Sequence, residues 1–323
     1  MNNCSNSQLN SIGDLPAGLQ KYSCAQNLIS EMENLPESLL DFNCSWNLIK
    51  KIENLPKLLK RLDCNQNQIK VITDLPYSIQ YLDISWNLIA VIENLPNSLQ
   101  YLDCSNNLVQ KIQNLPKSLR EFHCCSNDIK KMENLPSSLI KFVCFNNQIS
   151  KIENVPNFLQ ELDCYTNNIT KIENLPKSLR IFYCESNLIS KIENLPLSLT
   201  KFTCNKNQIT KIENLPDALK KFCCTNNQIT KIENLPMGLV EFLYDEVPLL
   251  QVDNVPYNRV HFSLLGYQAI KRFQKLLRKR HRTKINAIRK IQNGCHKWIW
   301  KPLCKDGSIG IRPRLDLKHF GIE

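Results

Sequence analysis

The chain has 323 residues and a formal net charge of +11, but this charge is unevenly placed. Residues 1–256 carry 24 Lys/Arg and 27 Asp/Glu, whereas residues 257–323 carry 17 Lys/Arg and 3 Asp/Glu. No run of 18 apolar residues predicts a membrane span, and no charged start followed by an apolar run predicts a secretory signal. With no export signal, the 15 cysteines favour an intracellular, reducing compartment over a disulfide framework.

Proline recurs every twenty residues from Pro16 to Pro256, thirteen times without a slip. A fixed period of this length is typical of a solenoid. Residues 1–256 are therefore predicted to form about 12 repeats of 20 residues, the first one degenerate, followed by a basic tail over residues 257–323. A single repeat cannot bury enough apolar surface to offset the ordering of its backbone, so the repeats must stack.

Aligning the repeats turns the chain into columns, which Leu179, Phe182, Cys184, Asn187 and Ile189 represent in one repeat. Phe182 and Cys184 are two residues apart, so on a strand they share a face, which is predicted to point inward. The pattern L-x-x-[FL]-x-C-x-x-N-x-[IV] resembles the leucine-rich repeat consensus, with Cys in one Leu position. This resemblance implies a leucine-rich repeat horseshoe with parallel β-strands on the concave face.

The segment that joins successive strands has no room for an α-helix. In Asn174-Leu175-Pro176 the proline fixes φ and the Asn can bond its own backbone. A mostly extended and 3₁₀ convex side is therefore predicted. A buried Asn187 amide is expected to bond the backbone of its own turn and of the next coil.

Two further resemblances concern the kind of protein. The continuation I-E-N-L-P is similar to the proline-marked repeat of bacterial effector leucine-rich proteins. The whole chain resembles leucine-rich repeat proteins of amoeba-infecting giant viruses (mimivirus-like), a resemblance that implies no particular activity. It implies a location in host cytoplasm or in the virion, with the nucleus as an alternative.

The column of ten cysteines has three interpretations, namely a metal ladder, a redox relay or core packing. A spacing of twenty places the thiols in a parallel row roughly 4.8 Å apart, which does not converge on a tetrahedral metal site. Ile84 fills the same position without a thiol. Core packing is therefore predicted for the column, with no metal or cofactor. Cys125 and Cys223 lie beside it and are expected to be solvent-exposed thiols.

Residues that flank the inward pair are predicted to face solvent on the concave side, where solenoids bind partners. There the early repeats place three aspartates, two tyrosines and two tryptophans, and an aromatic track is predicted to continue further along. Carboxylates beside exposed aromatic side chains suit a basic peptide or protein partner. The predicted partner-binding residues are Trp46, Asp63, Tyr81, Asp83, Trp86, Tyr101, Asp103, Phe145, Tyr165 and Tyr183. Copying of repeats without selection for a site is the alternative interpretation.

After Pro256 the period fails, and the apolar spacing predicts a C-terminal helical cap and a small hairpin. Capping does not require the high positive charge of residues 257–323, which suggests contact with nucleic acid or an anionic membrane. The predicted contact residues are Arg278, Lys279, Arg280, Arg282 and Lys284. Cys295, His296, Cys304 and His319 have unconvincing spacing for zinc.

No nucleophile–base pair, phosphate loop or metal signature is found in the sequence. The sequence therefore predicts a monomeric, non-enzymatic scaffold that binds a protein partner through its concave face. The alternative is a polyanion-binding protein whose basic tail makes the contact. Salt-resistant capture by the repeats would favour the first, and salt-sensitive capture by the tail the second.

Overall fold

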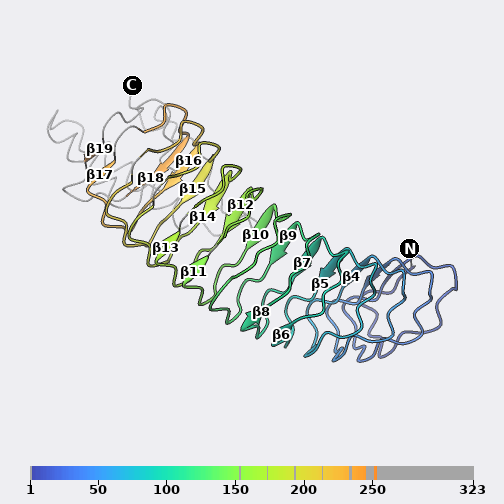
Figure 1. Cartoon of the computed structure of the whole chain (residues 1–323). Helices are drawn as coiled ribbons and strands as arrows, with labels where there is room; N and C mark the ends of the chain where they lie inside the picture. The colour runs from blue at the N-terminus through green and yellow to red at the C-terminus, as the bar shows by residue number, and fades with distance from the viewer. Residues whose placement is uncertain are drawn as a thin grey trace, which may run out of the picture.

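A computed structural model describes residues 2–152, 154–172, 174–192, 194–212, 214–232, 235–244 and 251–252. Over this part the chain winds into successive coils that stack along one axis, with the N-terminus at one end (Figure 1). The predicted solenoid is therefore confirmed. The predicted helical cap, the hairpin and the basic residues at 278–284 lie outside the described residues.

One long parallel sheet runs the length of the described solenoid, with one short strand from each coil. Neighbouring strands of this sheet pair residues that are twenty apart in the sequence, such as Phe182 and Phe202. The thirteen strands, in spatial order, are β1 (Asn2–Asn3), β2 (Lys21–Ser23), β3 (Asp41–Asn43), β4 (Arg61–Asp63), β5 (Tyr81–Asp83), β7 (Tyr101–Asp103), β9 (Glu121–His123), β10 (Lys141–Val143), β12 (Glu161–Asp163), β14 (Ile181–Tyr183), β15 (Lys201–Thr203), β16 (Lys221–Cys223) and β18 (Glu241–Leu243).

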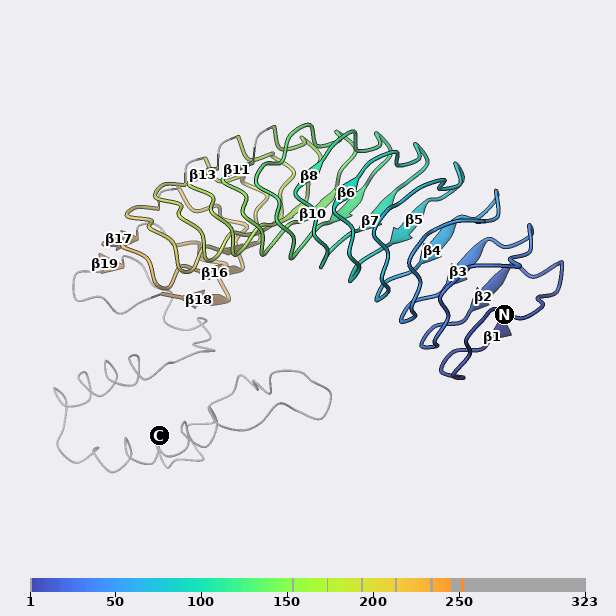
Figure 2. The same cartoon turned by 90° about the horizontal axis from the view of Figure 1, so that it is seen from below.

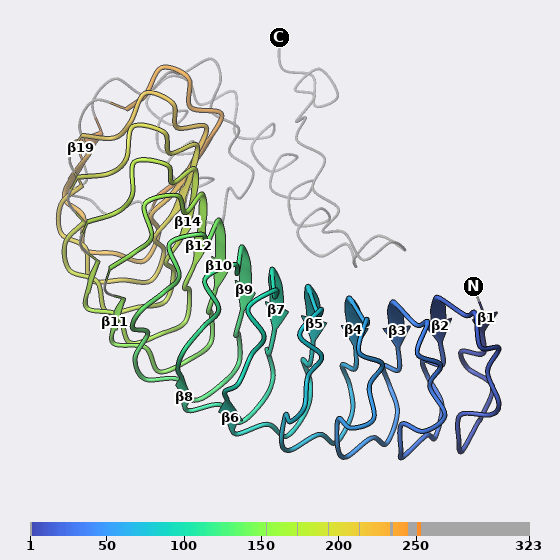
Figure 3. The same cartoon turned by 45° about the vertical axis from the view of Figure 1, so that its right-hand side comes forward.

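The outer side of the coil carries two-residue strands and turns. Figure 2 shows the long sheet along the inner edge of an arc and the short pairs along its outer edge. These outer pairs are β6 (Val91–Ile92) with β8 (Lys111–Ile112), β11 (Lys151–Ile152) with β13 (Lys171–Ile172), and β17 (Lys231–Ile232) with β19 (Gln251–Val252). Within the described residues every regular element is a strand. Figure 3 shows the inner strands following one another along the curve.

The turn after each proline is a single 3₁₀-type turn, in which for example Leu179 N–H donates to Pro176 O at 3.0 Å. The Asn before it has a left-handed backbone, with φ of 54° at Asn174 and 51–56° at the equivalent positions from Asn34 to Asn214. Asn tolerates this conformation far better than most residues do. The extended convex side is therefore confirmed, and the recurring Asn in I-E-N-L-P has a backbone explanation.

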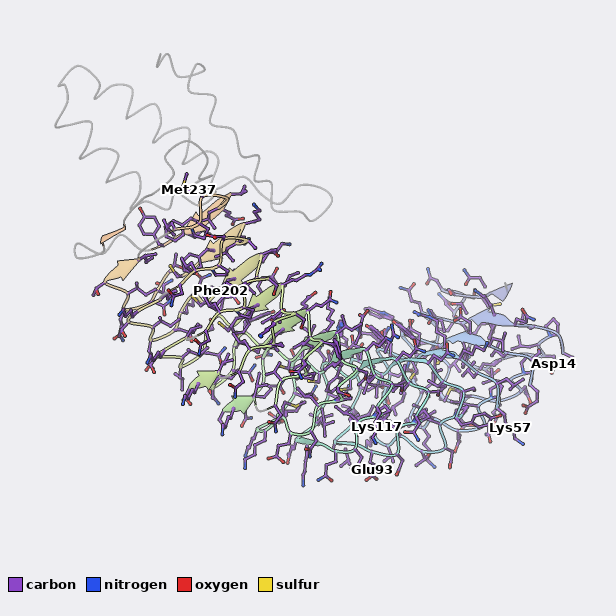
Figure 4. All side chains as sticks on the ribbon, turned by 45° about the horizontal axis from the view of Figure 1, so that its top comes forward. Asp14, Lys57, Glu93, Lys117, Phe202 and Met237 are labelled. Carbon is purple, nitrogen blue, oxygen red and sulfur yellow. The ribbon has the colours of Figure 1, made fainter. Side chains whose placement is uncertain are left out.

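The core is built from the predicted columns. Leu179, Phe182, Cys184 and Ile189 are all completely buried. Phe182 and Phe202 stack with ring centroids 5.6 Å apart, and the stack continues through Phe222. In Figure 4 the labelled Phe202 lies within the stacked coils, whereas Lys57, Glu93 and Lys117 belong to the exposed outer side. Each coil contributes the same apolar set, so the interior is one continuous core.

A buried asparagine column ties each coil to the one before it. The Asn187 side chain donates to the carbonyl oxygens of Cys184 in its own coil at 3.2 Å and Cys164 in the preceding coil at 3.0 Å. Its Oδ1 accepts the Ile169 N–H of the preceding coil at 2.9 Å. The predicted bonding of the Asn to its own turn is correct, but the neighbour it bonds is the preceding coil rather than the next one.

Candidate partner-binding face

The first and third residues of each inner strand point away from the core, onto the concave face. In β5, for example, Leu82 is completely buried while Tyr81 and Asp83 are half-buried. The position after each strand is the buried register column, and Trp46, Trp86, Phe145 and Tyr165 stand two or three positions after their strands. The predicted residues on the strands therefore share one face, namely Asp63, Tyr81, Asp83, Tyr101, Asp103 and Tyr183.

Three of the predicted residues form an aspartate row. Asp63 lies opposite Asp83, and Asp83 opposite Asp103, on adjacent parallel strands. Neighbouring carboxylates and partial burial both disfavour the charged form. Burial, followed by the Asp83 carboxylate, raises the pKa of Asp63 to about 6. Burial also raises the pKa of Asp103 above its usual range.

Each aspartate of the row is also held by donors within the protein. Asp83 Oδ1 accepts the Ser85 N–H at 3.0 Å and the Ser85 hydroxyl at 2.7 Å. Asn65 Nδ2 bridges the first two carboxylates, at 2.7 Å from Asp63 and 3.2 Å from Asp83. Asn43 makes the equivalent turn contact in an earlier coil, where its Oδ1 accepts the Ser45 N–H at 3.0 Å. The row therefore closes the turns after the strands, in addition to presenting charge.

An aromatic row runs beside the aspartates on the same strands. Tyr81 and Tyr101 stack with ring centroids 4.3 Å apart, and the Arg61 guanidinium lies 3.5 Å from the Tyr81 centroid. Tyr101 also contacts the ring of His123 at 5.3 Å. The aspartate–tyrosine patch is the name used below for the whole group, which consists of Arg61, Asp63, Tyr81, Asp83, Tyr101, Asp103 and His123.

His123 completes this patch and was not among the sequence-predicted residues. Its Nδ1 lies 4.0 Å from Asp103 Oδ2 and its Nε2 lies 3.9 Å from Glu121 Oε2. Burial lowers the pKa of His123, while the Asp103 carboxylate acts in the opposite direction. The sequence does contain a signal for His123. It stands twenty residues after Asp103 and therefore continues the aspartate row on the next strand.

Trp46 and Trp86 are exposed, as predicted, with 54% of each side chain's surface open to solvent. Both have a left-handed backbone, with φ of 56° and 55°. That conformation costs a bulky residue roughly 1–2 kcal/mol. The same position holds Asn106, Asn146 and Asn226 in other coils, where the cost is smaller. The tryptophans are thus exposed large side chains on a backbone that disfavours them.

The later aromatic residues form a second group rather than a continuation of the first. Phe145 and Tyr165 stack with centroids 4.4 Å apart, two positions beyond the column that holds Asp163. Tyr183 lies opposite Asp163 on the next strand. Asp163, Glu185 and Thr203 share this region and were not selected from the sequence. Asp163 was detectable, because it occupies the column of Asp63, Asp83 and Asp103.

The register cysteines pack in the core, in agreement with the packing interpretation. Those from Cys44 to Cys204 are completely buried, and burial raises the pKa of every one of these thiols well above the usual value. The described cysteines are all free thiols. Within the described residues no group of three His, Cys, Asp or Glu side chains is arranged to hold a metal ion.

The exposed thiols predicted at Cys125 and Cys223 are wrong. Cys125 is 3% exposed and Cys223 is 2% exposed, and burial raises the pKa of each to about 12. On the inner side of a curve, outward-pointing side chains crowd together, so small ones are covered by their neighbours. Cys125 also donates from its backbone N–H to Ser105 Oγ at 3.1 Å, which holds it close to the preceding coil.

The twenty-residue coil, the inner parallel sheet and the buried Asn column define a leucine-rich repeat solenoid. The comparisons agree with this class. YopM from Yersinia enterocolitica is 26% identical, with a TM-score of 0.65 over 76% of this chain and 58% of that protein. YopM from Yersinia pestis, described as a leucine-rich effector protein, is 25% identical, with a TM-score of 0.71 over 79% of this chain and 80% of its own.

The functional domain of InlJ from Listeria monocytogenes, described as including a cysteine ladder, is 24% identical, with a TM-score of 0.68 over 76% of this chain and 58% of that one. The chain thus spans less than two thirds of the Y. enterocolitica YopM and InlJ structures. No protein-family model and no curated protein sequence matches the chain. Among the described residues, no helix combines the length and apolar character of a membrane span.

Proposed function

We propose that the chain is a non-enzymatic interaction scaffold that binds a basic segment of a protein partner through its concave face. Leucine-rich repeat solenoids commonly present such extended concave surfaces to protein partners. The observation that carries the proposal is the pair of tryptophans, Trp46 and Trp86. Each is half exposed on a left-handed backbone, where other coils place Asn.

The charge of the face defines the partner's chemistry. The aspartate row lies next to stacked tyrosine rings, and tyrosine, tryptophan and arginine are the residues that dominate binding hot spots. A partner that inserts lysine or arginine side chains between Trp46 and the Asp63 carboxylate would gain charge-assisted hydrogen bonds and ring contacts. Repeat copying alone does not account for tryptophans two coils apart with Gln66 between them.

A pair of substitutions tests this proposal. Trp46→Asn with Trp86→Asn replaces both side chains by the residue used at the same position in other coils. We expect the fold to become more stable, by about 1 kcal/mol per site, because the left-handed backbone is less costly for Asn. Binding of the partner should fall at least tenfold. Affinity would be measured with a partner recovered by the full-length chain and identified by mass spectrometry.

A matched control is available elsewhere on the solenoid. Leu108 is 50% exposed, and other coils place Gln68 or Gln148 at this position. Leu108→Gln therefore removes an exposed apolar side chain by the same kind of substitution, and it should leave partner affinity unchanged. Equal loss of affinity in the control and in the tryptophan variant would contradict the concave-face proposal.

The proposal also covers the source of the partner and the compartment in which the two proteins meet. The likeness of the chain to giant-virus leucine-rich repeat proteins supports a host factor as the partner, met in the reducing host cytoplasm, the virion or the nucleus. The many free thiols of the described core support a reducing location. Fractionation of infected or expressing cells with an antibody against the chain would test the location.

A second function is proposed for the basic tail, supported by its charge alone. Residues 257–323 carry 17 Lys/Arg against 3 Asp/Glu, which suits nucleic acid or an anionic membrane. Binding of the full-length chain to RNA, DNA or anionic vesicles should weaken steeply with salt. Replacing Arg278, Arg280 and Arg282 by Gln should weaken it further, and salt-independent binding would contradict the proposal.

A further inference from the structure

Two carboxylates and two phenol rings occupy the corners of a square on the concave face of β12 and β14. Asp163 and Tyr183 lie opposite each other on adjacent strands. Tyr165 and Glu185 stand two residues further along the same two coils. The acids therefore lie on one diagonal, and the tyrosines on the other. This group of Asp163, Tyr165, Tyr183 and Glu185 is called the carboxylate–tyrosine square.

The backbone holds the square in place. Cys164 N–H donates to Tyr183 O at 2.8 Å, and Thr166 N–H donates to Glu185 O at 2.8 Å. These two bonds join the coils on either side of the square. Since strands are about 4.8 Å apart and two residues span about 6.6 Å, the diagonal between the acidic Cα atoms is about 8 Å. Both side chains can reach the centre from that distance.

The carboxylates of the square have buried oxygens with no hydrogen-bond donor. Asp163 Oδ1 and Glu185 Oε2 are both covered from solvent and lack a partner. Thr203 lies opposite Tyr183 on the following strand, is only 4% exposed, and its hydroxyl also lacks a partner. A buried acceptor without a donor is costly, so the two carboxylate oxygens can accept hydrogen bonds from a bound ligand.

The protein's own nearby cations are engaged elsewhere. Lys141, which acts on the charge of Asp163, pairs with Glu161 at 3.1 Å. Lys221, which acts on Tyr183, pairs with Glu241 at 3.1 Å. Burial, with the Glu185 carboxylate among the further causes, raises the pKa of Asp163 to about 7. Neither lysine is therefore paired with a carboxylate of the square.

We propose that the carboxylate–tyrosine square binds one arginine side chain of the protein partner. A guanidinium is planar and carries five N–H donors, so it can bridge two carboxylates that face it from opposite corners. Its faces can stack on the Tyr165 and Tyr183 rings. A lysine ammonium offers fewer donors in no fixed plane and fits the diagonal less well. This assignment rests on the proposed concave-face function and adds a specific subsite to it.

The test uses the full-length chain and a probe that carries one guanidinium, N-acetyl-arginine amide. The neutral probe N-acetyl-citrulline amide has nearly the same shape and no charge. Binding is followed at pH 8 through the ring signals of carbon-13-labelled tyrosines, assigned with Tyr165→Phe and Tyr183→Phe. The arginine probe should shift the signals of Tyr165 and Tyr183 in a saturable way at millimolar concentration, and the citrulline probe should not.

Substitutions then locate the probe. Asp163→Asn and Glu185→Gln should each weaken arginine-probe binding at least tenfold. Asn43 occupies the Asp163 column in another coil, so the Asn variant is expected to fold. Glu93→Gln removes a carboxylate from the exposed outer side of the solenoid, and it should leave the probe affinity unchanged. Equal binding of both probes, or unchanged affinity in Asp163→Asn and Glu185→Gln, would overturn the assignment.

Two further outcomes are informative. The chain's own basic residues are an alternative occupant, so the titration is repeated with Arg278, Arg280 and Arg282 replaced by Gln in the full-length chain. Probe binding that requires these replacements would overturn the assignment to a partner. The probe binds without a partner, so the subsite and the concave-face proposal can fail separately. If the tryptophan variant loses partner capture but still binds the probe, the subsite remains supported. If partner capture depends on the tryptophans but the probe does not bind, only the subsite is refuted.

Discussion

The aspartate–tyrosine patch and the carboxylate–tyrosine square have nearly the same side chains, yet they differ in how the acids are satisfied. In the patch, Ser85 and Asn65 stand two residues after an aspartate and donate to its carboxylate. In the square, the corresponding positions hold Tyr165 and Glu185, which leave Asp163 Oδ1 without a donor. The side chain two positions after the aspartate therefore decides whether the carboxylate gains a donor beyond the backbone N–H of that residue.

This comparison assumes that the buried Asn column holds the backbone in the same way in both regions. The largest predicted effect, loss of stability when an Asn of this column is replaced, tests that assumption. Asn107 and Asn167 each donate to carbonyl groups of two coils and accept an N–H from the preceding coil, one near each region. Asn107→Ala and Asn167→Ala should each lower the free energy of unfolding by about 3 kcal/mol, since several buried backbone groups lose their partners. Urea denaturation would measure the free energy of unfolding of both variants. Markedly unequal losses would contradict the assumption that the Asn column supports the two regions equally.

Charge reversal should have opposite effects in the two regions. Glu185→Lys places an ammonium near Asp163 Oδ1, which has no hydrogen-bond donor, and we expect a gain of about 1 kcal/mol in unfolding free energy at pH 8. Asp83→Lys removes the acceptor of the Ser85 and Asn65 side chains, and we expect a loss of about 1–2 kcal/mol. Thermal unfolding measures both variants. A loss of stability in both would contradict the contrast between satisfied and unsatisfied acids.

The aromatic stacks should contribute less. Tyr81 lies between the Arg61 guanidinium and the Tyr101 ring, whereas Phe145 stacks on Tyr165. Tyr81→Leu should cost about 1 kcal/mol beyond the change in buried area, from one ring pair and one cation–π contact. Phe145→Leu should cost about half as much, because it loses one ring pair. Equilibrium unfolding of both variants, with Tyr77→Leu on an exposed tyrosine as the control, would check the order.

Stability should also depend on pH in both regions. Burial raises the pKa of Asp63 to about 6 and that of Asp163 to about 7, above the value of about 3.9 for an unfolded aspartate. The folded state then holds protons that the unfolded state has released, so stability falls as pH rises from about 4 to about 7. Asp63→Asn and Asp163→Asn should each flatten this fall in a series of urea titrations. A steeper fall in either variant would contradict the raised pKa values.

Much of the fold was predictable because it is dictated by repetition. The proline period gave the coil, the spacing of Phe182 and Cys184 gave the inward face, and Asn187 gave the column that ties coils together. The direction of the Asn187 bonds toward the preceding coil was not predictable, because the column pattern does not contain the orientation of the side-chain amide. The burial of Cys125 and Cys223 also escaped prediction, since it arises from crowding on the inside of a curve.

The candidate site was predictable only in part. The sequence places Trp46, Tyr81 and Asp83 on one face, but it does not reveal that Ser85 already satisfies Asp83. That fact requires the distance between two side chains, which the column pattern does not contain. The sequence likewise does not reveal that Asp163, diagonal to Glu185, has a buried oxygen without a hydrogen-bond donor.

The most direct measurement is a crystal structure of the full-length chain grown at pH 8 with N-acetyl-arginine amide. We predict a guanidinium between Asp163 and Glu185, in hydrogen-bond contact with both carboxylates and stacked on a tyrosine ring. A structure in which Lys141 or another side chain of the chain itself occupies that position would contradict the account.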